Sequence, residues 1–344
     1  MSDIKGMGGL KAMRHDKKNP PSEPTTSFEG KTVLVTGANA GVGFQTALKV
    51  AKLGVSKLIL GVRNLNKGEA AKALMLSQSS ISPGDLVVES VDCDSPSSVS
   101  SFAKRISSSV DGLDVVLLNA GIAAPSYSVS KSGWEMTLHI NVLSTAQLAL
   151  ELLPLLRRSA EAHGRPSMLA ITGSEGYLDA QEPWLTPSPD EGLLEHVNKQ
   201  DNFDVGHQYH IAKILVQFFQ QGLVETLARN DSENEPIALV VSPGMCRTDM
   251  GREFGWAYRA FMELTYAYVG RTAEEGSRAM VSGLSQGKEA NGKFWKNNGF
   301  LEYVPQFSQW DKDTDNLSKG GSRYFRKRVG KDCSRKLGRK FWRY

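Results

Sequence analysis

The fold is decided by residues 31–50, KTVLVTGANAGVGFQTALKV, which join an expected strand to an expected helix through a glycine-rich turn. The first part is rich in β-branched residues and ends at Gly37, a pattern typical of a parallel strand that is covered on both faces. Apolar residues then recur at helical spacing until Gly54, a typical helix stop. Such a turn lets the backbone approach a pyrophosphate, and the start of the helix supplies free N–H groups.

The same alternation of strand and helix continues along the chain. Further strands are expected at residues 57–62, 85–92, 113–121, 167–173 and 237–242, and helices at 66–77, 97–110, 132–156 and 204–219. Alternation of this kind implies a parallel sheet with helices on both faces. We therefore predict an α/β protein with a Rossmann-type, doubly wound sheet of about seven strands in a single domain over residues 29–310. A disordered arm over 1–28 and a basic tail over 311–344 are expected to flank it.

Charge is unevenly distributed along the 344 residues. The net charge is +4, but residues 319–344 contain 11 basic residues and one acidic residue, so the rest of the chain is acidic. The tail places Phe325, Val329, Cys333, Leu337 and Phe341 four apart among cations. Two interpretations remain open, a basic amphipathic helix on an anionic membrane surface and a solvated disordered tail. No motif that reads nucleic-acid bases is present, so no nucleic-acid partner is expected.

The cysteines and the N-terminus predict the compartment. Three widely spaced cysteines give neither a disulfide framework nor the spacing of a metal site, which fits a reducing environment. No apolar run reaches the roughly 18–20 residues of a membrane span, and residues 1–27 lack the apolar core of a signal peptide. The expected location is the cytoplasm, with membrane association through the tail as an open addition.

The glycine-rich turn predicts a dinucleotide site, and the second strand indicates which dinucleotide. Thr36, Gly37, Gly41, Val42 and Gly43 form the turn. NAD-selective sites usually end the second strand with an acid that binds the ribose hydroxyls. This strand instead ends in Gly-Val-Arg-Asn, and the planar fork of Arg63 can pair with a 2′-phosphate. NADP(H) is therefore the predicted cofactor; the alternative is that Arg63 is a solvated loop residue.

Tyr209 and Lys213 lie one helical turn apart, so they share a face of the helix expected at 204–219. They are either a wetted helix edge or a proton donor and the cation that tunes it. A phenol has an ordinary pKa of about 10, and a nearby ammonium favours the phenolate and lowers that pKa. Reduction of a carbonyl by a nicotinamide requires such a proton donor beside the carbonyl oxygen.

Taken together, these motifs resemble the short-chain dehydrogenase/reductase family over about residues 29–300. The resemblance rests on the glycine motif, the Tyr–Lys pair and four further motifs in the family's order, namely Asp92-Cys93, Asn119-Ala120-Gly121, Asn141, and Pro243-Gly244 followed by Thr248. It implies an NAD(P)-dependent enzyme in which these residues bind the cofactor and Asn141 braces Lys213 through a helix kink and a water. The phrases RTAEEGSR and GKFWKNNGF are similar to fungal, retinol-dehydrogenase-like members, which often act in secondary metabolism.

The sequence departs from the family at ITGSEGY, residues 171–177. The family usually has two adjacent serines here, and Gly173 replaces the first. The motif register makes Ser174 the catalytic hydroxyl that orients the substrate oxygen, whereas a shift by one residue would leave Thr172 or nothing in place.

Three alternatives remain open. Residues 249–270, rich in aromatics, could roof an apolar substrate site or form a core-packing helix, and residues 177–205 could be an active-site loop or a decorative insertion. Asp92 could contact adenine or shape a turn.

The predicted function is NADP(H)-dependent interconversion of a carbonyl and an alcohol on a bulky apolar substrate, as a monomer or a homodimer. The alternative is a catalytically silent NADP(H)-binding regulatory protein.

Overall fold

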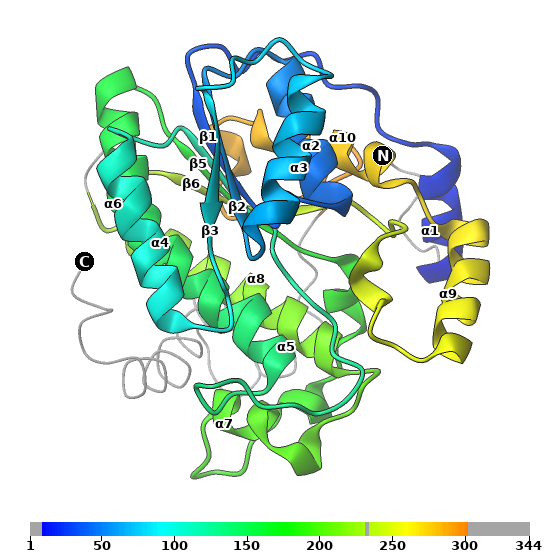
Figure 1. Cartoon of the computed structure of the whole chain (residues 1–344). Helices are drawn as coiled ribbons and strands as arrows, with labels where there is room; N and C mark the ends of the chain where they lie inside the picture. Colours follow the sequence, from blue (N-terminus) through cyan, green and yellow to red (C-terminus); the bar gives the residue numbers. More distant parts are fainter. Residues whose placement is uncertain (1–8, 231–233, 302–344) are drawn as a thin grey trace.

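An eight-stranded sheet forms the centre of the molecule (Figure 1). The computed structural model describes residues 9–230 and 234–301. The strand order is β3-β2-β1-β4-β5-β6-β7-β8, with every neighbouring pair parallel except β7 and β8. The strands are β1 Thr32–Thr36, β2 Lys57–Val62, β3 Leu86–Ser90, β4 Val115–Leu118, β5 Met168–Thr172, β6 Ile237–Ser242, β7 Phe294–Lys296 and β8 Gly299–Leu301. This confirms the predicted Rossmann-type parallel sheet and adds an antiparallel edge strand.

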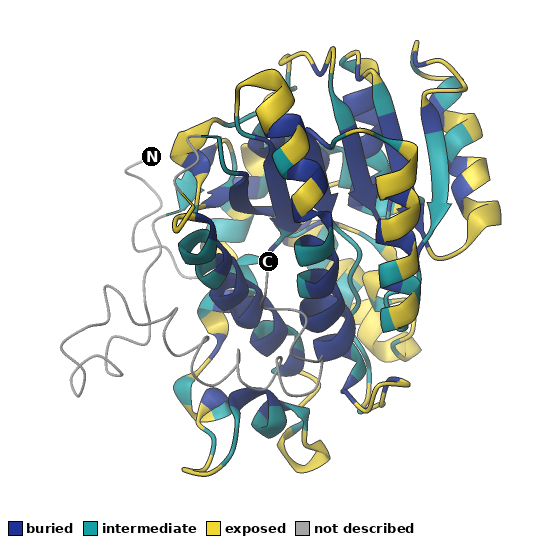
Figure 2. Cartoon of the chain, turned by 90° about the vertical axis from the view of Figure 1, so that its left-hand side faces the viewer, coloured by how far each residue is buried: buried dark blue, intermediate teal, exposed yellow. Residues whose placement is uncertain are grey.

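Helices cover both faces of the sheet, as the strand–helix alternation predicts. One face carries α4 Pro96–Ser109, α6 Thr145–His163 and α8 Gln208–Leu227, and the other carries α2 Gly41–Lys52, α3 Leu65–Leu76 and α10 Ala273–Leu284. Figure 2 shows buried residues on the strands and on the helix faces turned toward them, with exposed residues outside. The strands are therefore buried on both sides, which explains why they read as continuous apolar runs.

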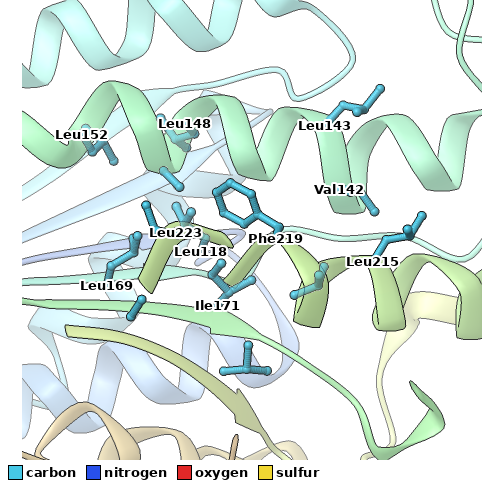
Figure 3. Packing of buried hydrophobic residues seen from close by; sticks show 14 of the residues in the cluster. Leu118, Val142, Leu143, Leu148, Leu152, Leu169, Ile171, Leu215, Phe219 and Leu223 are labelled. Atoms are coloured by element: carbon cyan, nitrogen blue, oxygen red, sulfur yellow. The ribbon is translucent and has the colours of Figure 1, made fainter. Parts of the chain in front are cut away.

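The larger core lies between the sheet and the pair α6 and α8. Figure 3 shows Leu148 of α6 and Phe219 of α8 facing Leu118 of β4 and Ile171 of β5. Burial of one such side chain stabilises the fold by about 1.5–3 kcal/mol. This packing fixes α8, the helix that carries Tyr209, against the carboxyl end of β5.

The last two strands were not located from the sequence, because each has only three residues. Asn297 and Asn298 join them with φ angles of 50° and 61°. Two consecutive residues with positive φ are typical of a type I′ hairpin turn, and asparagine tolerates this conformation better than most residues.

A disordered arm was expected over residues 1–28; residues 1–8 lie outside the described residues, and residues 9–28 differ from that expectation. Residues Gly9–Lys18 form helix α1, which packs against α9, Trp256–Val269 (Figure 1). Farther along, Phe28 is fully buried and its backbone N–H donates to the carbonyl of Leu53 at 2.9 Å. The arm has few apolar residues, but the buried side chain of Asp16 holds it in place through polar contacts. The composition of the segment does not reveal contacts of this kind. The basic tail at 311–344 lies outside the described residues.

Residues Met136–His163 have the length and apolar character of a membrane-spanning helix. However, 78% of their most apolar window is buried inside the fold. That burial is what a core helix against a sheet requires.

Candidate active site

The glycine-rich turn leads into a helix start that is open to a ligand. Helix α2 begins at Gly41, and its N-cap, Ala40, makes no side-chain cap hydrogen bond. By contrast, Asn64 caps α3 and accepts from the backbone N–H of Lys67 at 3.0 Å. The first N–H groups of α2 therefore stay free for an anion, and the dipole of the helix adds partial positive charge.

Backbone geometry explains the glycines of this turn. Gly37 and Gly41 have φ angles of 64° and 56°, in the left-handed region that favours glycine. At Gly43, a Cβ atom would lie 2.4 Å from the carbonyl oxygen of Gly37 and 2.4 Å from the side-chain nitrogen of Asn119. Val42, between them, is buried at the helix start. These residues fit the predicted pyrophosphate site.

Thr36 joins the turn to the end of β4. Its hydroxyl accepts hydrogen bonds from the backbone N–H groups of Asn119 at 2.9 Å and Ala120 at 3.1 Å. The side-chain amide of Asn119 donates to the carbonyl of Thr36 at 3.1 Å. Because β1 and β4 are the strands at which the sheet order reverses, these bonds lie at the crevice where such folds bind dinucleotides.

The loop after β6 reaches the same crevice. Gly244 has a φ angle of 74°, which turns the chain directly after Pro243. Thr248 then lies over the glycine-rich turn, since its Cγ2 would be 3.6 Å from a Cβ atom on Gly41. The structure therefore brings the predicted Pro-Gly and threonine residues beside the predicted phosphate site.

The residues predicted to select and hold the nucleoside end lie after β2 and β3. Arg63 is exposed immediately beyond β2, and its positive charge acts on the thiol of Cys93, so the two are neighbours. Burial raises the pKa of that thiol to about 11, with a further contribution from Asp92. One carboxylate oxygen of Asp92 accepts from the backbone N–H of Asp94 at 3.1 Å. Asp92 thus shapes a turn, the structural alternative, and its adenine contact stays a prediction.

Ser174 and Tyr209 meet at the carboxyl end of β5, where the Ser174 hydroxyl lies close enough to the phenol to lower the pKa of Tyr209. The backbone N–H of Gly176 donates to Ser174 Oγ at 3.1 Å and fixes the serine side chain. His210, next to Tyr209 on α8, holds the same loop through a 2.7 Å hydrogen bond from Nδ1 to the carbonyl oxygen of Gly176. Two consecutive residues of α8 therefore fasten the serine loop.

Lys213 completes the cluster from the next turn of α8. It is almost fully buried, and its Nζ donates to the carbonyl oxygen of Thr172 at 2.8 Å. Nζ also lies 5.4 Å from the centroid of the Tyr209 ring. Burial lowers the pKa of Lys213 to about 8.

The expected lowering of the Tyr209 pKa is wrong for this structure. Burial raises that pKa above its ordinary value by more than the hydrogen bond from Ser174 lowers it, and the nearby carboxylate of Glu175 raises it further. The phenol is therefore protonated at neutral pH, the state of a proton donor.

Asn141 lies in a π-helical segment, His139–Ser144, that interrupts the long helix predicted at 132–156. Its side-chain amide exchanges two hydrogen bonds with the backbone of Ile122, at 2.8 and 2.9 Å. A Cβ atom on Gly121 would lie 2.9 Å from Asn141 Oδ1, which explains the glycine of the Asn-Ala-Gly motif. The predicted helix kink is thus present as a π-bulge, a feature frequent at functional sites. The water that would link Asn141 to Lys213 stays a prediction.

Gly173 is explained by packing. A Cβ atom there would lie 2.3 Å from Cγ1 of Val240 and 3.0 Å from Cε2 of Phe294. The space that a side chain at 173 would need is therefore filled by β6 and β7. Gly173 leaves the motif register unchanged, since Ser174 is the residue that meets Tyr209.

Sequence reasoning missed the charged residues behind this cluster. Glu175 accepts from Ser242 Oγ at 2.5 Å and pairs with Lys296 Nζ at 2.9 Å. The position of Glu175 next to Ser174 in the sequence could have drawn attention to it. Its partners, however, lie in β6 and β7, and no local sequence pattern connects these strands to Glu175.

The two segments with open alternatives are now placed. Helix α9 leaves Trp256, Phe261 and Leu264 exposed to 83%, 65% and 73%, so a core-packing role is wrong for these residues. Residues 177–205 form short helices whose buried apolar residues join the larger core, namely Leu185, Leu193, Leu194 and Val197. That segment is therefore packed onto the main core, and its part in catalysis stays a prediction.

An uncapped, glycine-lined helix start at the switch point of a parallel sheet defines the class of Rossmann-type dinucleotide-binding proteins. Comparison with known proteins narrows the class. A family model described as short chain dehydrogenase matches residues 31–165. The chain belongs to the short-chain dehydrogenase/reductase family, oxidoreductases that bind a nicotinamide cofactor.

Several similar curated proteins are fungal. Short-chain dehydrogenase/reductase ffsI of Aspergillus flavipes is 39% identical over 298 residues, covering 87% of this chain and 86% of that protein. Short-chain dehydrogenase/reductase phmF of Phaeosphaeria nodorum is 40% identical over 284 residues, covering 82% of each. The Pseudomonas aeruginosa RhlG/NADP complex shares the fold with a TM-score of 0.58 at 22% identity, covering 79% of this chain and 96% of that one. Solved structures of similar fold include complexes with NADP and with NAD.

Proposed function

We propose that this protein is an NADP(H)-dependent oxidoreductase that interconverts a carbonyl and a primary or secondary alcohol on a bulky apolar substrate. The supporting observation is the cluster at the end of β5, where Ser174 meets Tyr209 and Lys213 lies one turn farther along α8. The fungal relatives support a place in secondary metabolism, and the cysteine content supports a cytoplasmic location.

The chemistry divides among three side chains. The bound nicotinamide supplies or accepts the hydride. Ser174, fixed by the N–H of Gly176, orients the substrate oxygen, and Tyr209 donates the proton that this oxygen needs when the carbonyl is reduced. Lys213, whose pKa of about 8 lies near neutral pH, would hold the cofactor and pass a proton toward Tyr209.

The preference for NADP(H) is supported by the end of β2. No acid stands there, and Arg63 is exposed directly beyond Val62, where a planar guanidinium could pair with a 2′-phosphate. The exposed aromatic residues of α9 support a bulky apolar substrate, because they follow the loop that carries Thr248. A catalytically silent binder is less well supported, since packing accounts for Gly173, the departure from the family's serine pair.

Parallel fluorescence titration with NADPH and NADH tests the cofactor. Wild-type protein is expected to bind NADPH at least about tenfold more tightly, because a lost charge-assisted pair costs roughly 1.5–3 kcal/mol. Arg63→Ala should remove that preference while leaving NADH binding unchanged. Lys67→Ala, which removes an exposed cation on α3, is the matched control. Equal affinities in the wild type would refute the assignment of NADP(H) and leave the catalytic cluster untouched.

A further inference from the structure

A chain of buried charges connects the serine loop to the N-terminal helix. Lys296 Nζ lies 2.9 Å from Glu175 Oε1 and 2.7 Å from Asp16 Oδ2, so one ammonium joins two carboxylates. The side chains of Glu175, Lys296 and Asp16 are exposed to only 19%, 14% and 7%. Asp16 belongs to α1 and lies far along the sequence from the motifs. Two ion pairs nevertheless connect it to Glu175, the residue next to Ser174.

Glu175 and Lys296 are held in their charged forms. Burial alone would raise the pKa of Glu175, but the ammonium of Lys296 and the hydrogen bond from Ser242 outweigh it and lower that pKa. Burial alone would lower the pKa of Lys296, but Glu175 and Asp16 outweigh it and raise that pKa. A buried charge that loses one partner is strongly destabilised, so the geometry of this chain of charges depends on each of its members.

The outer end of the chain is anchored at two points. Asn297 Nδ2 donates to Asp16 Oδ1 at 2.6 Å. The guanidinium of Arg271 donates to the backbone carbonyl of Asp16 from Nε at 3.0 Å and from Nη2 at 2.6 Å. Asp16 is therefore a fixed end point, although it lies in a segment whose composition predicts disorder.

The inner end of the chain joins two loops of the active site. Glu175 Oε2 accepts from Ser242 Oγ at 2.5 Å, and Ser242 Oγ in turn accepts from the N–H of Gly244 at 3.1 Å. One carboxylate thus sets the serine loop after β5 against the Pro-Gly loop after β6. A shift of Glu175 would move both loops.

Helix α1 also holds α9, which runs beside it in Figure 1. Lys17 Nζ donates to the carbonyl oxygen of Tyr266 at 3.2 Å, near the end of α9, and the guanidinium of Arg14 lies 4.5 Å from the ring centroid of Tyr268. The phenol of Tyr266 contributes to raising the pKa of Tyr209, which couples the end of α9 electrostatically to the proton donor.

We propose that Asp16 is a positioning residue of the active site, which through Lys296 and Glu175 makes helix α1 hold the serine loop and α9 in their reactive arrangement. The proposal rests on the proposed function, because it assigns to α1 a role in the same reaction. It predicts that the N-terminal helix affects turnover far more than it affects cofactor binding, since the phosphate turn is anchored separately through Thr36 and Asn119.

Steady-state kinetics on the full chain test this role, with NADPH and phenanthrenequinone, a bulky apolar diketone, as probes. Asp16→Asn is expected to lower kcat by about tenfold or more, because small displacements of positioning groups have large effects on rate. The Kd for NADPH should change little. Lys296→Arg, which keeps the charge, should retain more activity than Lys296→Met, which leaves Glu175 and Asp16 without their shared partner.

Glu23→Gln is the matched control. Glu23 lies in the same N-terminal segment and pairs with Lys49 at 2.5 Å and Arg278 at 3.1 Å, away from Glu175. Equal kcat values for Asp16→Asn and Glu23→Gln, measured below both melting temperatures, would overturn the proposal. If Asp16→Asn does not fold, the test uses Lys17→Met, a change at a half-buried residue of α1. This variant releases α9 and should raise the KM for the quinone. An unchanged KM would overturn the proposal.

The wild type separates this proposal from the proposed function. If wild-type protein reduces the quinone and Tyr209→Phe does not, the proposed function stands, and the Asp16 result concerns α1 alone. If wild-type and Tyr209→Phe proteins behave alike, the proposed function itself fails.

Discussion

Gly173 offers a quantitative test of how the serine loop is packed. In Gly173→Ala, the new Cβ would lie 2.3 Å from Val240 Cγ1 and 3.0 Å from Phe294 Cε2, whereas ordinary contacts lie at 3.4–4 Å. Val240 and Phe294 are both buried in strands, so neither can move away freely. Overpacking of this kind typically costs about 1–3 kcal/mol of unfolding free energy.

Thermal unfolding followed by circular dichroism measures this cost. For a chain of this length, each 1 kcal/mol lowers Tm by roughly 2 °C, so Gly173→Ala should melt about 2–6 °C below the wild type. Gly84→Ala is the control, because nothing lies within 4 Å of a Cβ there. Val240→Ala removes the clashing atom, so the double variant should be more stable than the two single effects added together predict. Equal Tm values for Gly173→Ala and Gly84→Ala would refute the packing explanation.

Two further predictions concern stability. Thr36→Val removes the acceptor of two backbone N–H groups while keeping the shape, so the unfolding free energy should fall by about 2 kcal/mol or more in urea titrations; an unchanged midpoint would contradict the hydrogen bonds at 2.9 and 3.1 Å. Lys213 has a folded pKa of about 8, below its ordinary 10.5, so the unfolded chain binds more protons between these values and stability should rise with pH there. Lys213→Met should lack that rise; an identical pH dependence would show that Lys213 is not desolvated.

The elements that sequence predicted are those with a strong local pattern. Strands β1 to β6 are apolar runs bounded by turns, and their alternation with helices fixes a parallel sheet. The phosphate turn was predictable because glycine spacing reflects backbone constraints that are local, as at Gly43. Tyr209 and Lys213 were predictable because a helix places residues four apart on one face.

The features that sequence did not predict depend on contacts between distant segments. Helix α1 has a low apolar content, and Asp16 is held by residues of β7 and of the loop before α10. The rise of the Tyr209 pKa depends on burial by the whole fold, so the spacing of Tyr209 and Lys213 predicted the wrong direction. The reason for Gly173 became visible only when β7 placed Phe294 beside it.

The most direct test of catalysis by the cluster at β5 is NADPH-dependent reduction of phenanthrenequinone by wild-type and Tyr209→Phe proteins, with NADPH binding followed by fluorescence in both. Loss of the positioned proton donor should lower kcat by roughly 100-fold or more while the Kd for NADPH stays the same. A Tyr209→Phe protein that binds NADPH and reduces the quinone at the wild-type rate would contradict the assignment of Tyr209 as the proton donor.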